Sequence, residues 1–278
     1  WGWGKNNAGQ LGDGTNIDRF TPTKIGNETW KQISAGNRAT NGIKMDGTLW
    51  SWGNIWNPNT NNYSWNTKNP LQITALVNCK QVICGYDNAM IIKNDGTLWA
   101  YGNNSGDCLG IGGSTNLTVP LQKIGTSTNW SKIFALGFAT KSDGTAWGWS
   151  NGNSGQFGNG TNSNYNSPTQ ISSNLGSNAV EISRGAFMTY YIKQDGTLWG
   201  TGSGILGDGT PYGNSRFVFT QVGSFNIWTK VAKLHSDITF AIQKNGSLWV
   251  CGGDNNFGML GLGDNNSSTQ KLAFTLVD

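Results

Sequence analysis

The chain is poor in histidine and in charged residues, on which much of enzyme chemistry depends. It contains one histidine, His235, in 278 residues, and only 12% of its residues are charged. One histidine cannot form a histidine-rich metal site, and His235 stands at a repeat position where a structural role is expected, so the sequence gives no indication of a Ser-His-Asp triad. A glycosidase would need two carboxylates across a cleft, but the 15 acidic residues lie mostly in turn positions. The sequence predicts a protein that is not an enzyme and that uses no cofactor and no metal.

Long apolar runs and blocks of like charge are also missing. No stretch of 18 consecutive apolar residues occurs, so the sequence predicts no membrane-spanning helix. The formal net charge is +4, without a stripe of Lys and Arg that could follow a phosphate backbone. We therefore expect neither a membrane span nor a nucleic-acid partner.

The four cysteines do not form a disulfide framework. Cys79 and Cys84 are five residues apart, so in one strand their side chains face opposite sides and cannot bond to each other. Cys84 and Cys251 take the places of apolar residues in repeated strands, and Cys108 lies alone in a glycine-rich loop. We expect free thiols.

Glycine and aromatic residues are abundant instead. The chain has 41 Gly, 14 Trp, 11 Phe and 7 Tyr, which supply tight turns and large apolar surfaces. A disordered chain would have few aromatics and a high net charge. Because residues that favour surface helices are scarce, the composition predicts an all-β fold.

One phrase, Asp-Gly-Thr-Leu-Trp with close variants, recurs along the whole chain. Its tryptophans stand 48 to 52 residues apart, at Trp1, Trp50, Trp99, Trp147, Trp199 and Trp249. A fixed period of this length is typical of a repeat architecture. An Asp-Gly pair between two β-rich segments predicts a tight hairpin turn.

Each unit is predicted to be a four-stranded antiparallel sheet. In the first unit the strands are expected at 1–4, 22–25, 30–35 and 40–44. The tryptophans of the phrase are expected to be largely buried between neighbouring sheets. The segment 137–143 is four residues shorter than its counterpart, which predicts a short fourth strand or a lost loop before it. The chain supplies six first and six second strands, but only five third and five fourth strands.

The strands of a unit carry short motifs in a constant order. In the first unit they are Trp1-Gly2-Trp3-Gly4, Asn6, Gly9-Gln10-Leu11-Gly12, Pro22, Ile33-Ser34-Ala35-Gly36, and Lys44 followed by Asp46-Gly47-Thr48-Leu49-Trp50. This order resembles the RCC1 repeat (regulator of chromosome condensation), in a bacterial or phage form. The resemblance covers nearly all of 1–278 and implies a single β-propeller domain with six or seven four-stranded blades.

The resemblance does not decide the function. The best-known member of the family acts as an exchange factor for a small GTPase on chromatin, but other members differ, and a shared fold implies no activity. A histidine is frequent after Ser-Ala-Gly in family repeats, and only His235 stands at that place here.

The strand count predicts that the propeller is incomplete within this chain. Six complete blades need two more strands than the sequence contains. We expect the strands at 1–4 and 274–276 to be completed by further residues of the same polypeptide or by a neighbouring subunit.

The segment 53–70 keeps the length of its counterparts but has lost the Gly-Gln-Leu-Gly motif. It has gained Trp56, Tyr63 and Trp65, flanked by Asn residues. Aromatic side chains among small polar ones are typical of loops that bind proteins or sugars. The alternative is that these rings pack onto the adjacent blade in place of the lost leucine. Arg216 and Phe217, in a second variant loop, are weaker binding candidates.

The Gly-Asp-Gly loops at 12–14 and 207–209 invite a calcium interpretation. Calcium takes six to eight oxygen ligands, and each loop offers one aspartate. Turn formation explains these loops better, because Asp bonds its own backbone and Gly accepts positive φ.

Two functional hypotheses follow. The first is a non-catalytic binding or structural propeller on an extracellular or virion surface, which contacts a protein or a surface glycan. The second is an intracellular regulator of a GTPase, or an inhibitor of an enzyme, that acts through one propeller face.

Overall fold

The computed structural model describes residues 1–113, 118–171, 179–234, 237–253, 255, 257–264 and 270–277. His235 lies outside these residues. The described chain is all-β, with strands β1 to β22 and a single 3-10 turn, η1 (Ser105–Asp107). None of its helical segments is long and apolar enough to cross a membrane.

The strands repeat in groups of four along the chain. The first strands are β1 (Gly2–Gly4), β5 (Leu49–Asn57), β9 (Leu98–Asn103), β13 (Ala146–Ser150), β17 (Leu198–Gly202) and β21 (Leu248–Gly252). The second strands are β2 (Arg19–Thr23), β6 (Asn62–Gln72), β10 (Thr118–Lys123), β14 (Tyr165–Gln170), β18 (Arg216–Gln221) and β22 (Lys271–Leu276). The third strands are β3 (Trp30–Ala35), β7 (Cys79–Cys84), β11 (Trp130–Ala135), β15 (Ala179–Arg184) and β19 (Trp228–Lys233). The fourth strands are β4 (Ala39–Lys44), β8 (Asn88–Lys93), β12 (Phe138–Lys141), β16 (Met188–Lys193) and β20 (Thr239–Gln243).

These strands confirm the predicted order and, within the described residues, the predicted numbers. One boundary was wrong: the first of the second strands runs from Arg19 to Thr23, so Pro22 lies near its end. What completes the two-stranded β1–β2 sheet stays a prediction.

The chain divides into two compact units. Unit 1 comprises Trp1–Ser142 and Asn166–Pro168, and unit 2 comprises Asp143–Tyr165 and Thr169–Asp278. Unit 1 holds the pair β1–β2, the four-stranded sheets β3–β6 and β7–β10, and the pair β11–β12. Unit 2 holds β13, the two ends of β14 (Tyr165, Thr169 and Gln170) and the four-stranded sheets β15–β18 and β19–β22. Each sheet is an antiparallel meander, in which neighbours in the chain are neighbours in space.

The repeated phrase forms the turn between the fourth strand and the next first strand. Asp46 Oδ1 accepts hydrogen bonds from the Thr48 amide (2.9 Å) and hydroxyl (2.7 Å), and Gly47 takes a φ of 81°. The Thr48 hydroxyl in turn accepts from Trp50 Nε1 at 2.9 Å. The same bonds recur at Asp95, Asp143 and Asp195, and an Asn-Gly-Ser version forms them at 245–247.

The tryptophans of the phrase are half-buried at Trp50, Trp99, Trp147, Trp199 and Trp249, and Trp1 is exposed. The Lys44 ammonium lies 4.0 Å from the centre of the Trp50 ring, and Lys193 lies 3.9 Å from that of Trp199. The fully buried ring stands two residues later in the same strand: Trp52 is 4% exposed and Trp149 is 0% exposed. The expected burial of Trp50, Trp99, Trp147 and Trp199 is therefore confirmed only in part, because the indole N–H of each donates to the threonine hydroxyl of the turn.

The shortened segment loses both loop and strand. β12 has four residues, and it follows β11 after a two-residue turn in which Gly137 takes a φ of 76°. Trp130 still pairs with Lys141, as Trp30 pairs with Lys44, so the register is kept. Both predicted consequences of the deletion are found.

Side chains fasten adjacent third strands to one another in unit 1. The Gln32 amide group donates to Val82 O (3.0 Å) and accepts from Val82 N (2.9 Å). Gln81 makes the same two bonds to Ile133 at 2.6 and 2.7 Å. Between the sheets lie buried apolar residues, among them Ile43, Leu49, Ile91 and Tyr101.

All four cysteines are free, as predicted. Burial raises the pKa of the Cys79 thiol to about 11 and that of Cys251 to about 12. These thiols are therefore protonated at neutral pH and act as small apolar groups.

Candidate functional site

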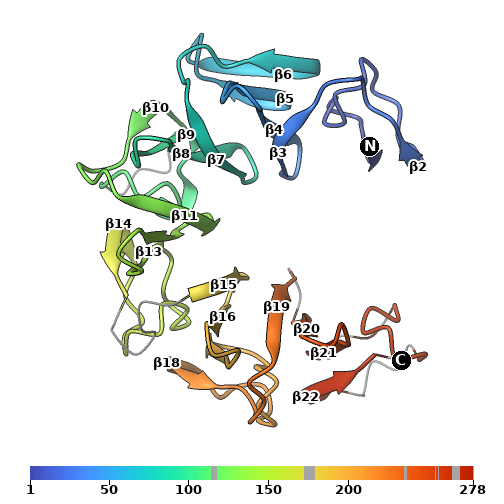
Figure 1. Cartoon of the computed structure of the whole chain (residues 1–278), viewed down its shortest axis with the longest axis vertical. Coiled ribbons are helices and arrows are strands. Elements are labelled where there is room, and N and C mark those ends of the chain that lie inside the picture. Colours follow the sequence, from blue (N-terminus) through green and yellow to red (C-terminus); the bar gives the residue numbers. More distant parts are fainter. Residues whose placement is uncertain are drawn as a thin grey trace. The chain divides into compact units, whose positions relative to one another are not determined.

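The segment 53–70, predicted as a loop, is a β-hairpin. β5 continues to Asn57 and β6 begins at Asn62, with Ile55 opposite Ser64 and Trp56 opposite Tyr63. β6 has 11 residues, whereas the other second strands have five or six. Aromatic and β-branched residues favour paired strands. In this repeat, backbone pairing between β5 and β6 takes the place of the lost Gly-Gln-Leu-Gly motif. Figure 1 shows this ribbon at the edge of the β3–β6 sheet.

Asparagines hold the tip of the hairpin. Asn57 Oδ1 accepts a hydrogen bond from the Asn59 amide at 2.9 Å, and Asn61 takes a φ of 51°. The Asn59 side chain donates to Gln72 O (2.8 Å) and accepts from Thr74 N (3.0 Å). The tip is therefore tied back to the base of β6, which fixes the position of the hairpin.

Three rings, Trp56, Tyr63 and Trp65, form what we call the aromatic ladder. The Trp56 and Tyr63 centroids lie 5.2 Å apart in an edge-to-face arrangement, and Tyr63 and Trp65 are stacked at 5.2 Å with an interplanar angle of 19°. Trp56 packs against the buried cluster that includes Tyr101. The Tyr63 hydroxyl lies 3.4 Å from the Thr118 hydroxyl.

The outer end of the ladder faces solvent. Trp65 is 65% exposed, while Tyr63 and Trp56 are half-buried beneath it. The rings were expected either to bind a partner or to pack onto the adjacent blade. Trp56 packs onto the core, whereas Trp65 remains exposed to solvent. The three rings of the ladder therefore extend from the core, at Trp56, to the surface, at Trp65.

Arg216 and Phe217 lie in unit 2 and do not belong to the ladder. The Arg216 guanidinium is 3.1 Å from Asp208 Oδ2 and 3.2 Å from the Thr210 hydroxyl, so it closes its own loop. Phe217 is 40% exposed, and its ring covers Gly155, where an added Cβ would lie 2.7 Å from the ring. Their role in binding stays a prediction.

Sequence reasoning missed a buried asparagine that organises these loops. The fully buried Asn6 donates through Nδ2 to Asp13 Oδ1 (3.0 Å) and to Ile17 O (3.2 Å). Its Oδ1 accepts from Leu11 N at 2.9 Å. Asn104 and Asn255 make the same bond to Leu109 N and Leu260 N. The signal was present, since each asparagine stands five residues before a leucine.

Asp13 is part of the same network. Its Oδ1 also accepts from the Thr15 amide and hydroxyl, and its Oδ2 accepts from Arg19 at 2.6 Å. Burial alone would raise the pKa of Asp13, but the bonds from Thr15, Arg19 and Asn6 outweigh it and lower the pKa to about 2. Both carboxylate oxygens are occupied, which agrees with turn formation. Among the described residues no group of three or more His, Cys, Asp or Glu is placed to hold a metal ion.

Comparison with known proteins agrees with the repeats and the fold. Residues 1–41 and 143–192 match the family model of the regulator of chromosome condensation (RCC1) repeat. The structure of human WBSCR16 matches with a TM-score of 0.82 at 21% identity, over 100% of this chain and 76% of that one. Prp20p from Saccharomyces cerevisiae, whose structure is described with its binding to Gsp1p and histones, matches with a TM-score of 0.80 at 20% identity, over 99% and 72%. Yeast RCC1 (Prp20) bound to Kap60 matches with a TM-score of 0.81 at 21% identity, over 99% and 70%.

The chain carries RCC1-type repeats and has the fold of an RCC1-like β-propeller, as its sequence predicts. The structural similarity establishes the fold. At sequence identities of 20 to 21% it does not transfer the function of those proteins to this chain. The bacterial or phage type stays a prediction.

Proposed function

We propose that this protein is a non-catalytic binding module that contacts another protein through the aromatic ladder. The observation that carries the proposal is the exposed Trp65 ring, stacked on Tyr63 and through it on the half-buried Trp56. Trp and Tyr rings are enriched among the residues that dominate binding energy at interfaces.

The ladder is ordered before any partner binds. Stacking fixes the Trp65 ring, and the bonds of Asn59 fix the hairpin that presents it. A contact surface that is already rigid loses little conformational entropy on association, which strengthens binding. An exposed indole held in this way suits a shallow apolar depression on a partner.

Two further observations support a binding role. The similar structures include Prp20p, described with its binding to Gsp1p and histones, and the same protein bound to Kap60. Those partners belong to those proteins, but they show that this fold serves as a protein-binding scaffold. In addition, the buried thiols have raised pKa values and are poor nucleophiles at neutral pH.

The proposed contact takes place at an extracellular or virion surface. The low charge and the loops rich in Gly, Asn, Ser and Thr support this location. The alternative is an intracellular partner such as a GTPase or an enzyme. Recovery of a soluble GTPase or enzyme at stoichiometric level from the source organism would overturn the surface location.

The test of the ladder compares Trp65→Ala with Phe20→Ala. Phe20 is 92% exposed in β2, so its loss removes a similar apolar surface from outside the hairpin. Proteins captured by the wild type are identified, purified and titrated against all three forms. We expect Trp65→Ala to weaken the complex about tenfold or more and Phe20→Ala to leave it unchanged.

The outcomes separate the competing ideas. Equal affinity of the wild type and Trp65→Ala for the purified partner would overturn the role of the ladder. Binding to a glycan that requires Trp65, with no protein partner, would overturn the protein as the ligand and keep the site.

A further inference from the structure

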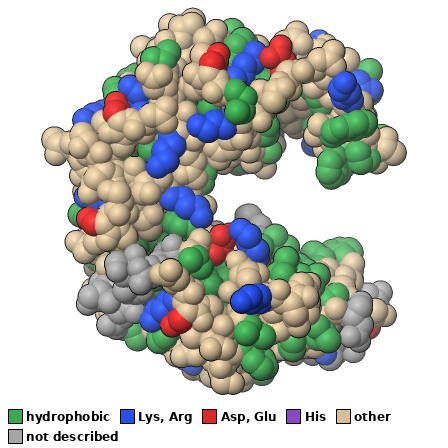
Figure 2. Space-filling view, in the orientation of Figure 1, with side chains coloured by type: hydrophobic (Ala, Val, Ile, Leu, Met, Phe, Trp, Pro, Cys, Tyr) green, Lys and Arg blue, Asp and Glu red, His purple; other side chains and the backbone are tan. Residues whose placement is uncertain are grey.

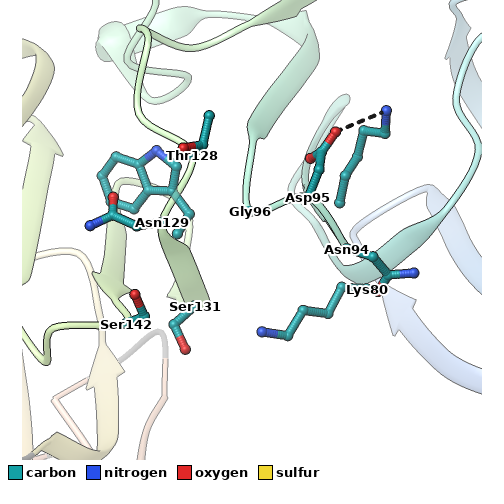
Figure 3. A pocket seen from close by; sticks show the side chains of 10 residues that line it. Lys80, Asn94, Asp95, Gly96, Thr128, Asn129, Ser131 and Ser142 are labelled. Atoms are coloured by element: carbon teal, nitrogen blue, oxygen red, sulfur yellow. Dashed lines mark ion pairs between the residues drawn. The ribbon is translucent and has the colours of Figure 1, made fainter.

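Unit 1 contains an open cavity beside the Asp95-Gly96 turn (Figure 3). Its volume is about 250 Å³, and it lies between this turn and the segment that leads into β11. Its walls are polar: they include Lys80, Lys93, Asp95, Asn129, Ser131 and Ser142. The aromatic ladder contributes no residue to it.

The charged residues of the wall leave one lysine without a counter-ion. Lys93 Nζ lies 3.5 Å from Asp95 Oδ2. The other Asp95 oxygen accepts from the Thr97 hydroxyl (2.6 Å) and amide (3.0 Å). Lys80 has no ion pair or side-chain hydrogen bond within the part of the chain that the structure describes. The wall therefore carries one positive charge that is not offset, on Lys80.

Neutral donors face the same space. Figure 3 shows the Lys80 side chain directed across the opening toward Ser131 and Ser142. The Ser131 and Ser142 hydroxyls and the Asn129 amide group make no side-chain hydrogen bond to the described residues. Hydroxyls and amides around one ammonium are the groups that hold an anionic oxygen by charge-assisted hydrogen bonds.

The charge of the surrounding unit also favours an anionic ligand. Unit 1 has twelve Lys and Arg against seven Asp and Glu, a net charge of +5, whereas unit 2 has seven against eight, a net charge of −1. Figure 2 shows Lys and Arg side chains on the face of unit 1 that carries β7 and β11. A net positive charge around a polar recess raises the local concentration of anions.

We propose that this cavity binds a single oxyanionic group, of the carboxylate or phosphate type, through the Lys80 ammonium and the Ser131 and Ser142 hydroxyls. A metal cation fits less well, because Asp95 is the one carboxylate in the wall and its oxygens already have donors. The site does not rest on the function proposed for the aromatic ladder, and either can fail alone.

The experiment titrates ¹⁵N-labelled protein with inorganic phosphate in one arm and acetate in the other, with chloride added to hold ionic strength constant. Three forms are compared: wild type, Lys80→Gln and Lys31→Gln. Lys31 holds in β3 the strand position that Lys80 holds in β7, is exposed, and lies outside the cavity. The Lys31→Gln variant therefore removes one positive charge, as Lys80→Gln does, and leaves the cavity wall unchanged.

We expect saturable shifts of the amide signals of residues 128–131 and 142 in the wild type. Lys80→Gln should weaken binding about tenfold or more, and Lys31→Gln less than twofold. Stronger binding of phosphate than of acetate identifies a phosphate ligand, and the reverse order a carboxylate. Shifts that do not saturate in either arm, or equal weakening by both variants, would overturn the proposal.

Ser142→Asp provides a second, independent variant. Ser142 is exposed, so the change is compatible with folding, and it adds a carboxylate to the cavity wall. We expect it to abolish binding of both anions, because its own charge neutralises Lys80. Unchanged anion affinity in Ser142→Asp would contradict the assigned position of the ligand.

Discussion

Two neighbouring repeats of unit 1 hold the connection between their first and second strands in different ways. The loop between β1 and β2 is held by side chains, with Asn6 bonded to Asp13 and to Leu11 N. The β5–β6 hairpin is held by backbone pairing, out to Asn57 opposite Asn62. Both cover a buried ring of the next sheet: the first reaches Trp52, whose Nε1 donates to Gln10 O at 2.9 Å, and the second places Trp56 against the cluster of Tyr101.

The difference lies in which side chains remain available. In the β1–β2 loop, the polar groups of Asn6, Asp13 and Arg19 are all consumed in holding the loop together. In the hairpin the paired backbone satisfies itself and only the tip is tied by side chains, those of Asn57 and Asn59, so the other side chains along it can take other roles. Trp65 is the result: an exposed ring that the fold does not require. Replacement of a self-contained loop by a ribbon thus creates a surface suited to recognition.

The largest effect is expected from the ring that the β1–β2 loop covers. Trp52→Ala should lower the free energy of unfolding by about 3–5 kcal/mol, because it empties a fully buried site. Trp50→Ala should cost clearly less, since that ring is half-buried and capped by Thr48 and Lys44. Urea denaturation measures both. If the two variants lose the same free energy of unfolding, then Trp52 is not the core residue of this strand.

The next largest effect on stability distinguishes the β1–β2 loop, which side chains hold, from the β5–β6 hairpin, which backbone pairing holds. Asn6→Ala should lower the free energy of unfolding by about 1–3 kcal/mol, because Leu11 N and Asp13 lose a buried partner. The matched change in the hairpin, Asn62→Ala, removes an exposed asparagine and should cost little. Both are measured by thermal and urea unfolding. A loss for Asn62→Ala as large as that for Asn6→Ala would show that the paired strands, and not only the tip, depend on a side chain, since Asn62 Oδ1 accepts from Tyr63 N.

The β1–β2 loop should also make stability depend on pH, through Asp13. Its pKa is lowered to about 2 in the folded chain, from 3.8. The group therefore contributes stability that is present above about pH 4 and is lost as the pH falls toward 2. The expected loss is about 2 kcal/mol.

Other aspartates, including Asp46, Asp195 and Asp208, also have lowered pKa values, so the wild type alone does not isolate Asp13. The measurement is the difference in unfolding free energy between wild type and Asp13→Asn from pH 5 to pH 2. That difference should shrink as the pH falls. A constant difference would mean that the Asp13 carboxylate is not the titrating group.

The sequence predicted the strands because each of them repeats a local pattern. Trp30 to Ala35 and the Asp46-Gly47 turn carry their own signals, so the meander of β3, β4 and β5 could be read directly. The hairpin was predicted as a loop because the segment lacks the motif of its counterparts, and the packing of Trp56 on the cluster of Tyr101 joins residues that are distant in sequence. The phrase tryptophans were assigned to the core from hydrophobicity alone, whereas the hydroxyl of Thr48 and the charge of Lys44 keep Trp50 near the surface.

The candidate site was predicted in its residues and not in its geometry. Trp56, Tyr63 and Trp65 were chosen from composition, and the structure brings them together because Trp56 and Tyr63 are opposite each other while Tyr63 and Trp65 share a strand face. Arg216 looked similar in sequence, but its partner Asp208 occupies it. Only the three-dimensional structure distinguishes a charge that is already paired from one that is available.

The smallest effect on stability is expected where the effect on binding is greatest. Trp65→Ala removes an exposed ring that touches Tyr63 on one face, so the free energy of unfolding should change by no more than about 1 kcal/mol, the value of one aromatic pair. Trp56→Ala should cost more, because Trp56 packs against the buried cluster. Urea denaturation of the two variants, measured beside the wild type, tests this order. If Trp65→Ala destabilises the chain as much as Trp56→Ala, the ladder is a structural unit from end to end, and the ring that the ribbon exposes is not free for a partner.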